Sequence, residues 1–346
     1  MSATTTQQPL IELTKKDYQS DQEVRWCPGC GDYAILSSFQ TLFAKLGIPK
    51  EKFVVVSGIG CSSRFPYYMN TFGFHSIHGR APAIATGIKL QNPDLSVWVI
   101  TGDGDGLSIG GNHLIHALRR NVGLKIILFN NRIYGLTKGQ YSPTSEIGKR
   151  TSSTPMGSVD RPFNPISLAL GAEATFVARS LDIYREHLQE TLERAAAHEG
   201  SSFVEIYQNC NIFNDHAFTF MTDKQIRDDE QVVLQKGKPL IFGAKLDKAI
   251  CRTPGGRGLE VVQITDDFDR SRILVHDPGR ANPSFAFELS RMATPDFPTP
   301  IGVFRDVQVK PLEQGIHEQI DEARKKHGKK PDLQELLGRS ETWTVS

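Results

Sequence analysis

The sequence lacks the features that mark membrane, secreted and nucleic-acid-binding proteins. No apolar run approaches the roughly 18 residues that a membrane-spanning helix needs. The 40 lysines and arginines nearly balance the 39 aspartates and glutamates, so the net charge of +1 provides no basic field for nucleic acid or an anionic membrane. The N-terminal sequence has no basic segment followed by an apolar one, as a secretory signal would. We therefore expect a cytoplasmic protein that binds neither membrane nor nucleic acid.

Cysteine is also scarce, and the five cysteines do not form the even set of a disulfide framework. Cys27 and Cys30 form a C-x-x-C motif, which by itself is typical of zinc, iron–sulfur or thioredoxin-like sites. Cys61 and Cys210 each follow an apolar run, and Cys251 is expected to be an ordinary thiol. Four thiolates suit Zn²⁺ or a 4Fe–4S cluster. One pair with two distant single cysteines favours the cluster, because zinc ribbons usually pair two C-x-x-C knuckles.

The stretch 97–136 contains the strongest pattern for a phosphate site. Apolar runs at 97–100 and 124–129 predict strands, and between them lie a glycine-rich turn (GDGDG, 102–106) and a helical pattern (109–120). A right-handed crossover would make the two strands parallel, so Asp103 and Asn131 would both lie at the carboxyl ends, where α/β sheets bind ligands. Glycines and a helix start suit a phosphate, while carboxylate and amide oxygens suit Mg²⁺. The simpler alternative is a tight turn and a polar strand end.

The rest of the chain divides into three predicted regions. Residues 1–20 are expected to be an N-terminal arm, 21–211 the binding domain, and 212–346 an extension that wraps the core or contacts a partner. Within the binding domain the pattern predicts strands at 53–56, 174–178 and 203–207, and helices at 33–46 (with Asp32 as a cap), 81–90, 164–170 and 181–198. A charged helix is expected at 313–327. Residues 134–157 are expected to form a functional loop.

Several segments together resemble one enzyme family. WCPGCGDY, SGIGCSSR, HGRAPAIATGIK, GDGD with the later GGNH, NNRIYGLTKGQYSPT and QNCNIFND are similar to the β subunits of 2-oxoacid:ferredoxin oxidoreductases, in particular the 2-oxoglutarate (KorB) type. The resemblance implies an α/β thiamine diphosphate-binding fold, with a parallel sheet flanked by helices and a less regular C-terminal extension. It also implies Mg²⁺, held by Asp103, Asn131 and the Ile133 carbonyl, and one 4Fe–4S cluster on Cys27, Cys30, Cys61 and Cys210.

The same resemblance implies further site residues. Arg64 and His78 would be catalytic, with Arg64 binding the carboxylate of the 2-oxoacid. The cofactor would contact a larger set of residues, namely Ile59, Gly60, Ser62, Ser63, His78, Gly79, Arg80, Gly102, Asp103, Gly104, Asp105, Gly106, Asn131, Ile133, Tyr134, Gly135, Leu136 and Thr137.

The implied reaction is the oxidative decarboxylation of a 2-oxoacid with coenzyme A to acyl-CoA, CO₂ and reduced ferredoxin. For 2-oxoglutarate the product would be succinyl-CoA; pyruvate and branched-chain 2-oxoacids stay open. An α subunit would supply the pyrimidine half of the cofactor site and the coenzyme A site, in an αβ or (αβ)₂ assembly, so this chain alone is expected to be inactive. The alternatives are half of a non-redox thiamine diphosphate decarboxylase or synthase, and a non-enzymatic metal-binding scaffold. An NAD site is disfavoured, because GDGDG is not G-x-G-x-x-G.

Overall fold

The computed structural model describes residues 13–328 and 332–343 of the chain. Its centre is an eight-stranded sheet in the order β2-β1-β3-β4-β6-β5-β11-β7. The strands are β1 (Phe53–Ser57), β2 (Phe72–His75), β3 (Ser96–Gly102), β4 (Leu124–Asn130), β5 (Phe176–Leu181), β6 (Ser202–Tyr207), β7 (Gln231–Leu234) and β11 (Thr299–Asp306). All neighbours pair in parallel except β11 and β5, which are antiparallel. The predicted parallel sheet and the crossover between β3 and β4 are therefore confirmed.

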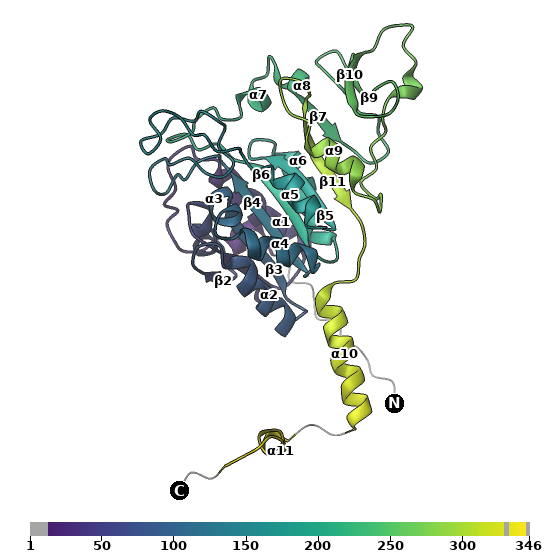
Figure 1. Cartoon of the computed structure of the whole chain (residues 1–346). Helices are drawn as coiled ribbons and strands as arrows, with labels where there is room; N and C mark the ends of the chain where they lie inside the picture. The colour runs from purple at the N-terminus through teal and green to yellow at the C-terminus, as the bar shows by residue number, and fades with distance from the viewer. Residues whose placement is uncertain (1–12, 329–331, 344–346) are drawn as a thin grey trace.

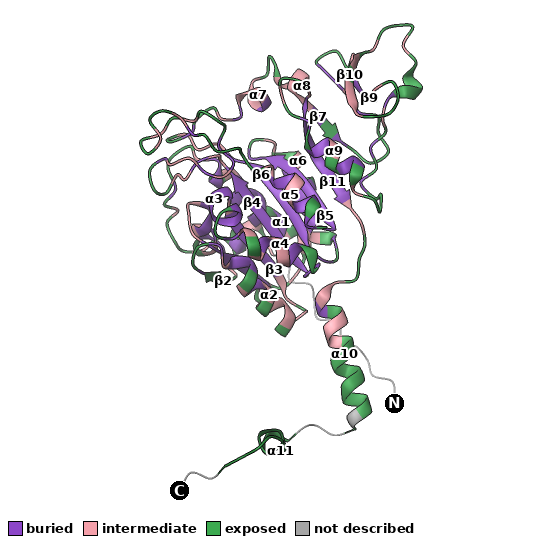
Figure 2. Cartoon of the chain, viewed as in Figure 1, coloured by how far each residue is buried: buried purple, intermediate pink, exposed green. Residues whose placement is uncertain are grey.

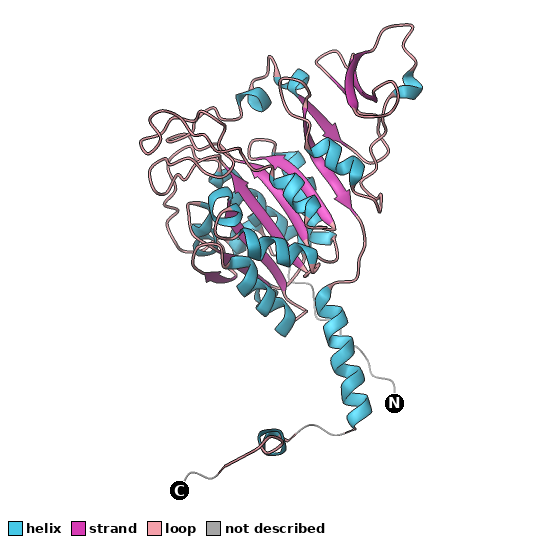
Figure 3. Cartoon of the chain, in the orientation of Figure 1, coloured by secondary structure: helices cyan, strands magenta, loops and turns pink. Residues whose placement is uncertain are grey.

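Helices cover both faces of this sheet (Figures 1 and 3). They are α1 (Asp32–Leu46), α2 (Ala81–Gln91), α3 (Asp103–Leu107), α4 (Gly111–Arg119), α5 (Pro165–Gly171), α6 (Arg185–Ala197) and α9 (Ser284–Ser290). Because successive side chains of a strand point to opposite faces, each central strand contributes side chains to two separate hydrophobic cores. Val97 and Val99 of β3 pack on the face covered by α2 and α4, and Trp98 packs on the face covered by α1 and α6. The buried strands stand out in Figure 2.

Three local predictions were wrong. The GDGDG segment is not a turn: Gly102 ends β3, and the other four residues lie in the short helix α3, which begins at Asp103. Asp32 does not cap α1: it is the first helical residue and its side chain is buried, while Gly31 occupies the cap position. Leu181, predicted to start a helix, ends β5, and α6 begins at Arg185. In each case tertiary packing outweighs the local pattern.

The C-terminal region contributes to the main sheet and also extends beyond it. β7 and β11 form one edge of the eight-stranded sheet, and β8 (Ile241–Phe242), β9 (Lys248–Arg252) and β10 (Leu259–Gln263) form a second, antiparallel sheet. The short helices α7 (Thr219–Thr222) and α8 (Arg227–Glu230) precede β7. The helices α10 (Leu312–His327) and α11 (Leu333–Leu337) extend away from the sheet (Figure 1). No helix in the described part of the chain is long and apolar enough to cross a membrane.

Candidate functional site: a cavity at the carboxyl ends of the central strands

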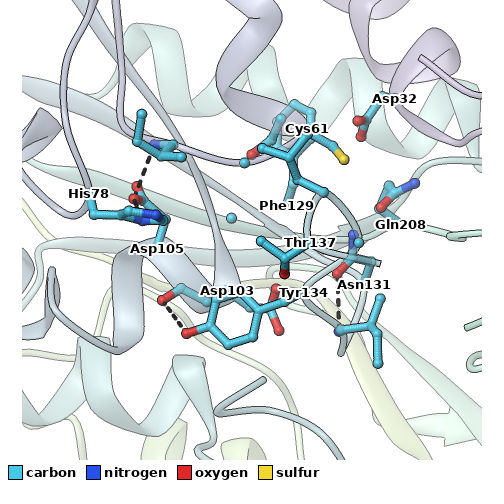
Figure 4. Close-up of a pocket in the computed structure, with 18 residues that line it drawn as sticks. Asp32, Cys61, His78, Asp103, Asp105, Phe129, Asn131, Tyr134, Thr137 and Gln208 are labelled. Carbon is cyan, nitrogen blue, oxygen red and sulfur yellow. Dashed lines mark hydrogen bonds and ion pairs between the residues drawn. The ribbon is translucent and has the colours of Figure 1, made fainter. Parts of the chain in front are cut away.

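One cavity lies where the carboxyl ends of β1, β3, β4 and β6 meet, and Figure 4 shows the side chains around it. Most of the predicted cofactor residues line it: Ile59, Gly60, Ser62, His78, Gly102, Asp103, Gly104, Asp105, Asn131, Ile133, Tyr134, Gly135, Leu136 and Thr137. We call the part around Asp103, Asp105 and Asn131 the acidic end. The part around Cys61 and Asp32, together with the adjacent thiols of Cys27, Cys30 and Cys210, is the sulfur end.

Asp103 presents a buried carboxylate to the cavity. Its Oδ2 accepts hydrogen bonds of 2.5 Å from the hydroxyls of Ser142 and Thr144, which belong to the loop after β4. Burial raises the pKa of Asp103 to about 6, although both hydroxyls act in the opposite direction. Because these partners are neutral, the ionised carboxylate lacks a positive neighbour of its own. A cation in the cavity would supply one, so the residue suits the predicted Mg²⁺.

Asp105 has a different role, although it lies only two residues further on. Its Oδ1 accepts from the backbone N–H groups of Gly79 (2.8 Å) and Ile59 (3.1 Å), and its Oδ2 accepts from the Thr101 hydroxyl (2.8 Å). The Nδ1 of His78 lies 3.2 Å from the same Oδ1. Asp105 therefore joins the segments after β1 and β2 to α3, and so holds His78 at the cavity.

The loop after β4 completes the acidic end. Asn131 lines the cavity, its Oδ1 accepts from the Ile133 N–H (3.2 Å), and its carbonyl accepts from the Asn214 amide (2.8 Å). Tyr134 packs against Gly104 so closely that a Cβ there would lie 2.1 Å from its ring. Its hydroxyl donates to the Gly104 carbonyl (3.1 Å). Only glycine allows this approach, which brings the loop at Tyr134 to the start of α3.

Four thiols from three segments of the chain are neighbours at the sulfur end. The Cys30 N–H donates to the Cys27 carbonyl (3.1 Å), forming a turn before α1. A Cβ on Gly135 would lie 3.5 Å from the Cys210 sulfur and 3.8 Å from the Cys61 sulfur. Burial, followed by the nearby Asp32 carboxylate, raises the pKa of Cys61 to about 12 and also raises the pKa of Cys30. Cys251 lies elsewhere, in β9.

The four thiols are the type of ligand that both Zn²⁺ and an iron–sulfur cluster take. Nowhere in residues 13–328 and 332–343 do three His, Cys, Asp or Glu side chains gather as closely as one metal ion requires. Zn²⁺ binds each sulfur at about 2.3 Å, which brings the four sulfurs close together, whereas the larger iron–sulfur cube holds them further apart. Burial raises the pKa of the Cys30 and Cys61 thiols, so their thiolates need positive charge beside them, which a metal centre of either kind would supply.

Sequence reasoning did not assign Asp32, Phe129 or Gln208 to the cavity, but all three line it. Asp32 is fully buried, and its Oδ1 has no hydrogen-bond partner. Burial and the nearby Asp182 carboxylate raise the pKa of Asp32 to about 7. Gln208 directly follows β6, and its side-chain N–H donates to the Cys30 sulfur (3.2 Å). The available signals were the position of Asp32 after CPGCG and that of Gln208 two residues before Cys210.

Eight predicted residues do not line this cavity. Three of them, Cys27, Cys30 and Cys210, are neighbours of Cys61, which does line it. Ser63, Gly79 and Gly106 are buried behind it, and Arg80 lies at the start of α2. Arg64 lines a separate surface cavity together with Gln22, Glu23, Arg25, Tyr67 and Tyr68. Its guanidinium donates to the Tyr68 hydroxyl (2.8 Å) and lies 5.8 Å from the ring centres of Tyr67 and Tyr68.

Comparison with known proteins agrees with this arrangement. Residues 58–206, which begin directly after β1 and include β2 to β5 and nearly all of β6, match the family model described as "Thiamine pyrophosphate enzyme, C-terminal TPP binding domain". Subunit KorB of the 2-oxoglutarate oxidoreductase of Mycobacterium tuberculosis is 54% identical over 99% of this chain and 90% of its own length. The chain belongs to the 2-oxoacid:ferredoxin oxidoreductase β-subunit family. The family predicted from the motifs is therefore confirmed.

Two further relatives show how much of this β subunit is shared. Subunit beta of 2-oxoacid:ferredoxin oxidoreductase 1 of Aeropyrum pernix is 45% identical, over 61% of this chain and 68% of its own. A solved structure of the 2-oxoglutarate:ferredoxin oxidoreductase of Magnetococcus marinus, with 2-oxoglutarate, coenzyme A and succinyl-CoA bound, has a TM-score of 0.73 at 32% identity. That match covers 95% of this β subunit and 97% of the solved chain, so the fold is shared along nearly the whole length.

Proposed function

We propose that this chain is the β subunit of a 2-oxoglutarate:ferredoxin oxidoreductase. The enzyme would convert 2-oxoglutarate and coenzyme A to succinyl-CoA and CO₂ and reduce ferredoxin, working in the cytoplasm together with an α subunit. The choice of 2-oxoglutarate rests on the similarity to KorB of Mycobacterium tuberculosis and to the Magnetococcus marinus enzyme.

One observation carries the proposal: Asp103 and Asn131 share a cavity with Cys61, and the other cysteine thiols of the sulfur end are its neighbours. A thiamine enzyme without redox chemistry uses the first two residues and has no use for the thiols. A structural metal site needs the thiols and has no use for the acidic end. The combination supports a reaction in which a cofactor passes electrons to an adjacent cluster.

The residues of the acidic end would hold the cofactor through its diphosphate. Thiamine diphosphate, when bound, supplies a nucleophilic carbon and an electron sink for decarboxylation. Asp103, Asn131 and the Ile133 carbonyl would hold Mg²⁺, which neutralises phosphate charge. Asp105 keeps the backbone at Ile59 and Gly79 in place through its hydrogen bonds, and so acts as a positioning residue.

Arg64 would bind a substrate carboxylate, as its motif predicts. Among the described residues it forms no ion pair with a carboxylate, so its charge is available to an anion. It lies three residues after Cys61, but outside the cavity. The proposal therefore requires that the α subunit or the substrate bring its guanidinium toward the reacting atoms, in place of its present contacts with Tyr67 and Tyr68.

The α subunit would close the cavity and supply the parts that this chain lacks under the proposal, namely the pyrimidine half of the cofactor site and the coenzyme A site. We also propose that residues 21–211 act as the cofactor-binding unit and that the C-terminal extension, which contributes β7 and β11 to the sheet, makes contacts with the partner. The assembly would be αβ or (αβ)₂. The predicted arm at 1–20 lies partly outside the described residues.

The test is a substrate panel on the chain purified together with its α subunit under anaerobic conditions. We expect acceptor reduction that requires both 2-oxoglutarate and coenzyme A, and protein-bound iron and sulfide in equal amounts. Pyruvate and a branched-chain 2-oxoacid serve as competitors in the panel and would replace the substrate assignment if they were faster. Colourless protein with bound zinc and 2-oxoacid decarboxylation without electron transfer would instead show a non-redox thiamine enzyme.

A further inference from the structure

Gln208 connects the two ends of the cavity. It is fully buried and follows β6, where its backbone N–H donates to the Asn130 carbonyl (3.0 Å) and continues the ladder between β4 and β6 by one residue. The strand pairing therefore determines where its side chain begins. Figure 4 shows the Gln208 amide on the same side of the cavity as Asp32 and Cys61.

The side-chain amide of Gln208 has a definite orientation. Its Nε2 donates to the Asn209 carbonyl (2.6 Å) and to the Cys30 sulfur (3.2 Å). Both partners are acceptors, so the nitrogen rather than the oxygen must face them. In the part of the chain that the structure describes, no other side-chain N–H donates to a cysteine sulfur. The contact is thus specific to this residue and this sulfur.

Two carboxylates near Cys30 would affect the reduction of a cluster bound there. Asp32 lies two residues after Cys30, is fully buried and has no hydrogen-bond partner for its Oδ1, and the Asp182 carboxylate accepts from the Asn209 N–H next to Gln208 (2.9 Å). Negative charge near a cluster opposes its reduction, because reduction adds a further negative charge to the cluster and its sulfurs. A donated N–H has the opposite effect, because its dipole stabilises the electron-rich sulfur more than the oxidised one.

We infer that Gln208 is a positioning residue that raises the reduction potential of the cluster through its N–H···S hydrogen bond to Cys30. The inference rests on the proposed function, because it requires the cluster on the four cysteines. Gln208 would partly offset the nearby carboxylates, and so make the cluster a better acceptor for electrons from the cofactor cavity that the same side chain lines.

The experiment is a redox titration, monitored by electron paramagnetic resonance, of the complex with its α subunit. Gln208→Met keeps the length of the side chain and removes the donor, and Gln208→Leu removes it with a different shape. Gln189→Met is the matched control, because the Gln189 amide donates to Glu193 on α6 (3.1 Å) and not to a sulfur. The signal of the relevant cluster is identified by its absence in Cys210→Ser.

We expect the midpoint potential to become more negative in both Gln208 variants, with unchanged iron and sulfide content, and to stay at the wild-type value in Gln189→Met. An unchanged potential in a Gln208 variant that holds the full cluster would overturn the inference and leave the proposed function intact. Loss of the cluster in both Gln208 variants would also overturn it, since Gln208 would then be needed for assembly. Wild-type complex without iron and sulfide would instead refute the proposed function.

Discussion

The acidic end and the sulfur end of the cavity bury their charged groups in different surroundings. At the acidic end, the Asp105 carboxylate accepts three hydrogen bonds of 2.8 to 3.1 Å from Gly79, Ile59 and Thr101. At the sulfur end, the Asp32 Oδ1 has no partner, and the pKa of Cys61 is raised to about 12 by burial and by Asp32. The chain therefore stabilises the buried carboxylates of the acidic end with its own hydrogen bonds. The buried groups of the sulfur end would instead be stabilised by a positively charged group among the thiols.

The comparison teaches that the two halves of the site should respond separately to mutation. The acidic end is tied to β3, α3 and the loop after β4, while Cys27, Cys30 and Cys210 come from the start of α1 and the segment after β6. A change at one end should therefore remove one group and leave the other bound. A variant at one end that loses both groups would contradict this separation.

The largest effect is expected for Cys210→Ser in the complex with the α subunit. It should remove the cluster iron and reduce acceptor reduction by more than the roughly 10–100-fold that loss of a supporting residue costs a metal site. Thiamine diphosphate binding should be retained, as measured by calorimetry. Cys251→Ser, in β9, is the control and should keep iron and activity. Loss of cofactor binding in Cys210→Ser would show that the two ends are not separate.

Asp103→Ala should give the reverse pattern. Without the buried carboxylate, Mg²⁺-dependent binding of thiamine diphosphate should be lost, and turnover with it. Iron and sulfide, measured on the same sample, should stay at the wild-type level. Full cofactor affinity in this variant would remove Asp103 from the proposed Mg²⁺ site.

Two aspartates two residues apart should differ in their effect on folding. Asp105→Ala leaves buried donors of Gly79, Ile59 and Thr101 without an acceptor, so it should lower the free energy of unfolding by about 3 kcal/mol or more. Asp103→Ala should leave stability unchanged or raised, because burial disfavours the ionised Asp103 and the Thr144 hydroxyl can donate to Asn130 instead (2.9 Å). Denaturant unfolding of the purified chain at pH 7.5 would measure both. Equal destabilisation would contradict the assigned roles.

The last effect concerns the pH dependence of stability and involves a residue outside both ends of the cavity. Burial between α6 and β5 lowers the pKa of His187 to about 4, below its ordinary 6.5. Protonation of His187 therefore favours the unfolded chain. The stability is unaffected by this group above about pH 6.5. As the pH falls toward 4, the free energy of unfolding decreases by up to about 3 kcal/mol. His187→Gln should flatten the unfolding free energy across this range. A profile with the same slope in that variant would assign the pH dependence to other groups.

The sequence predicts the acidic end well, because its residues follow strands that apolar runs identify. Asp103 and Asn131 lie at strand ends, and the order of strands and helices from β3 to β4 follows the pattern along the chain. The sulfur end is harder, since Cys61 and Cys210 are far apart in sequence, and their positions after apolar runs left Zn²⁺ and a cluster both open until the family motifs were considered. Gln208 and Asp32 depend on neighbours that folding brings to them, and their only signal in the sequence is that each lies two residues from a motif cysteine. The same holds for β7 and β11, which reach the main sheet from a region without regular periodicity.

The central claim is that one cavity in this chain adjoins both a thiamine cofactor and an iron–sulfur cluster. The most direct test is to add 2-oxoglutarate alone to the anaerobic, oxidised complex with its α subunit and to follow the cluster by absorbance and electron paramagnetic resonance. The account predicts partial reduction of the cluster by the substrate, in wild-type complex but not in Asp103→Ala, which keeps its iron. A fully loaded cluster that stays oxidised in the wild-type complex, with or without coenzyme A, would contradict it.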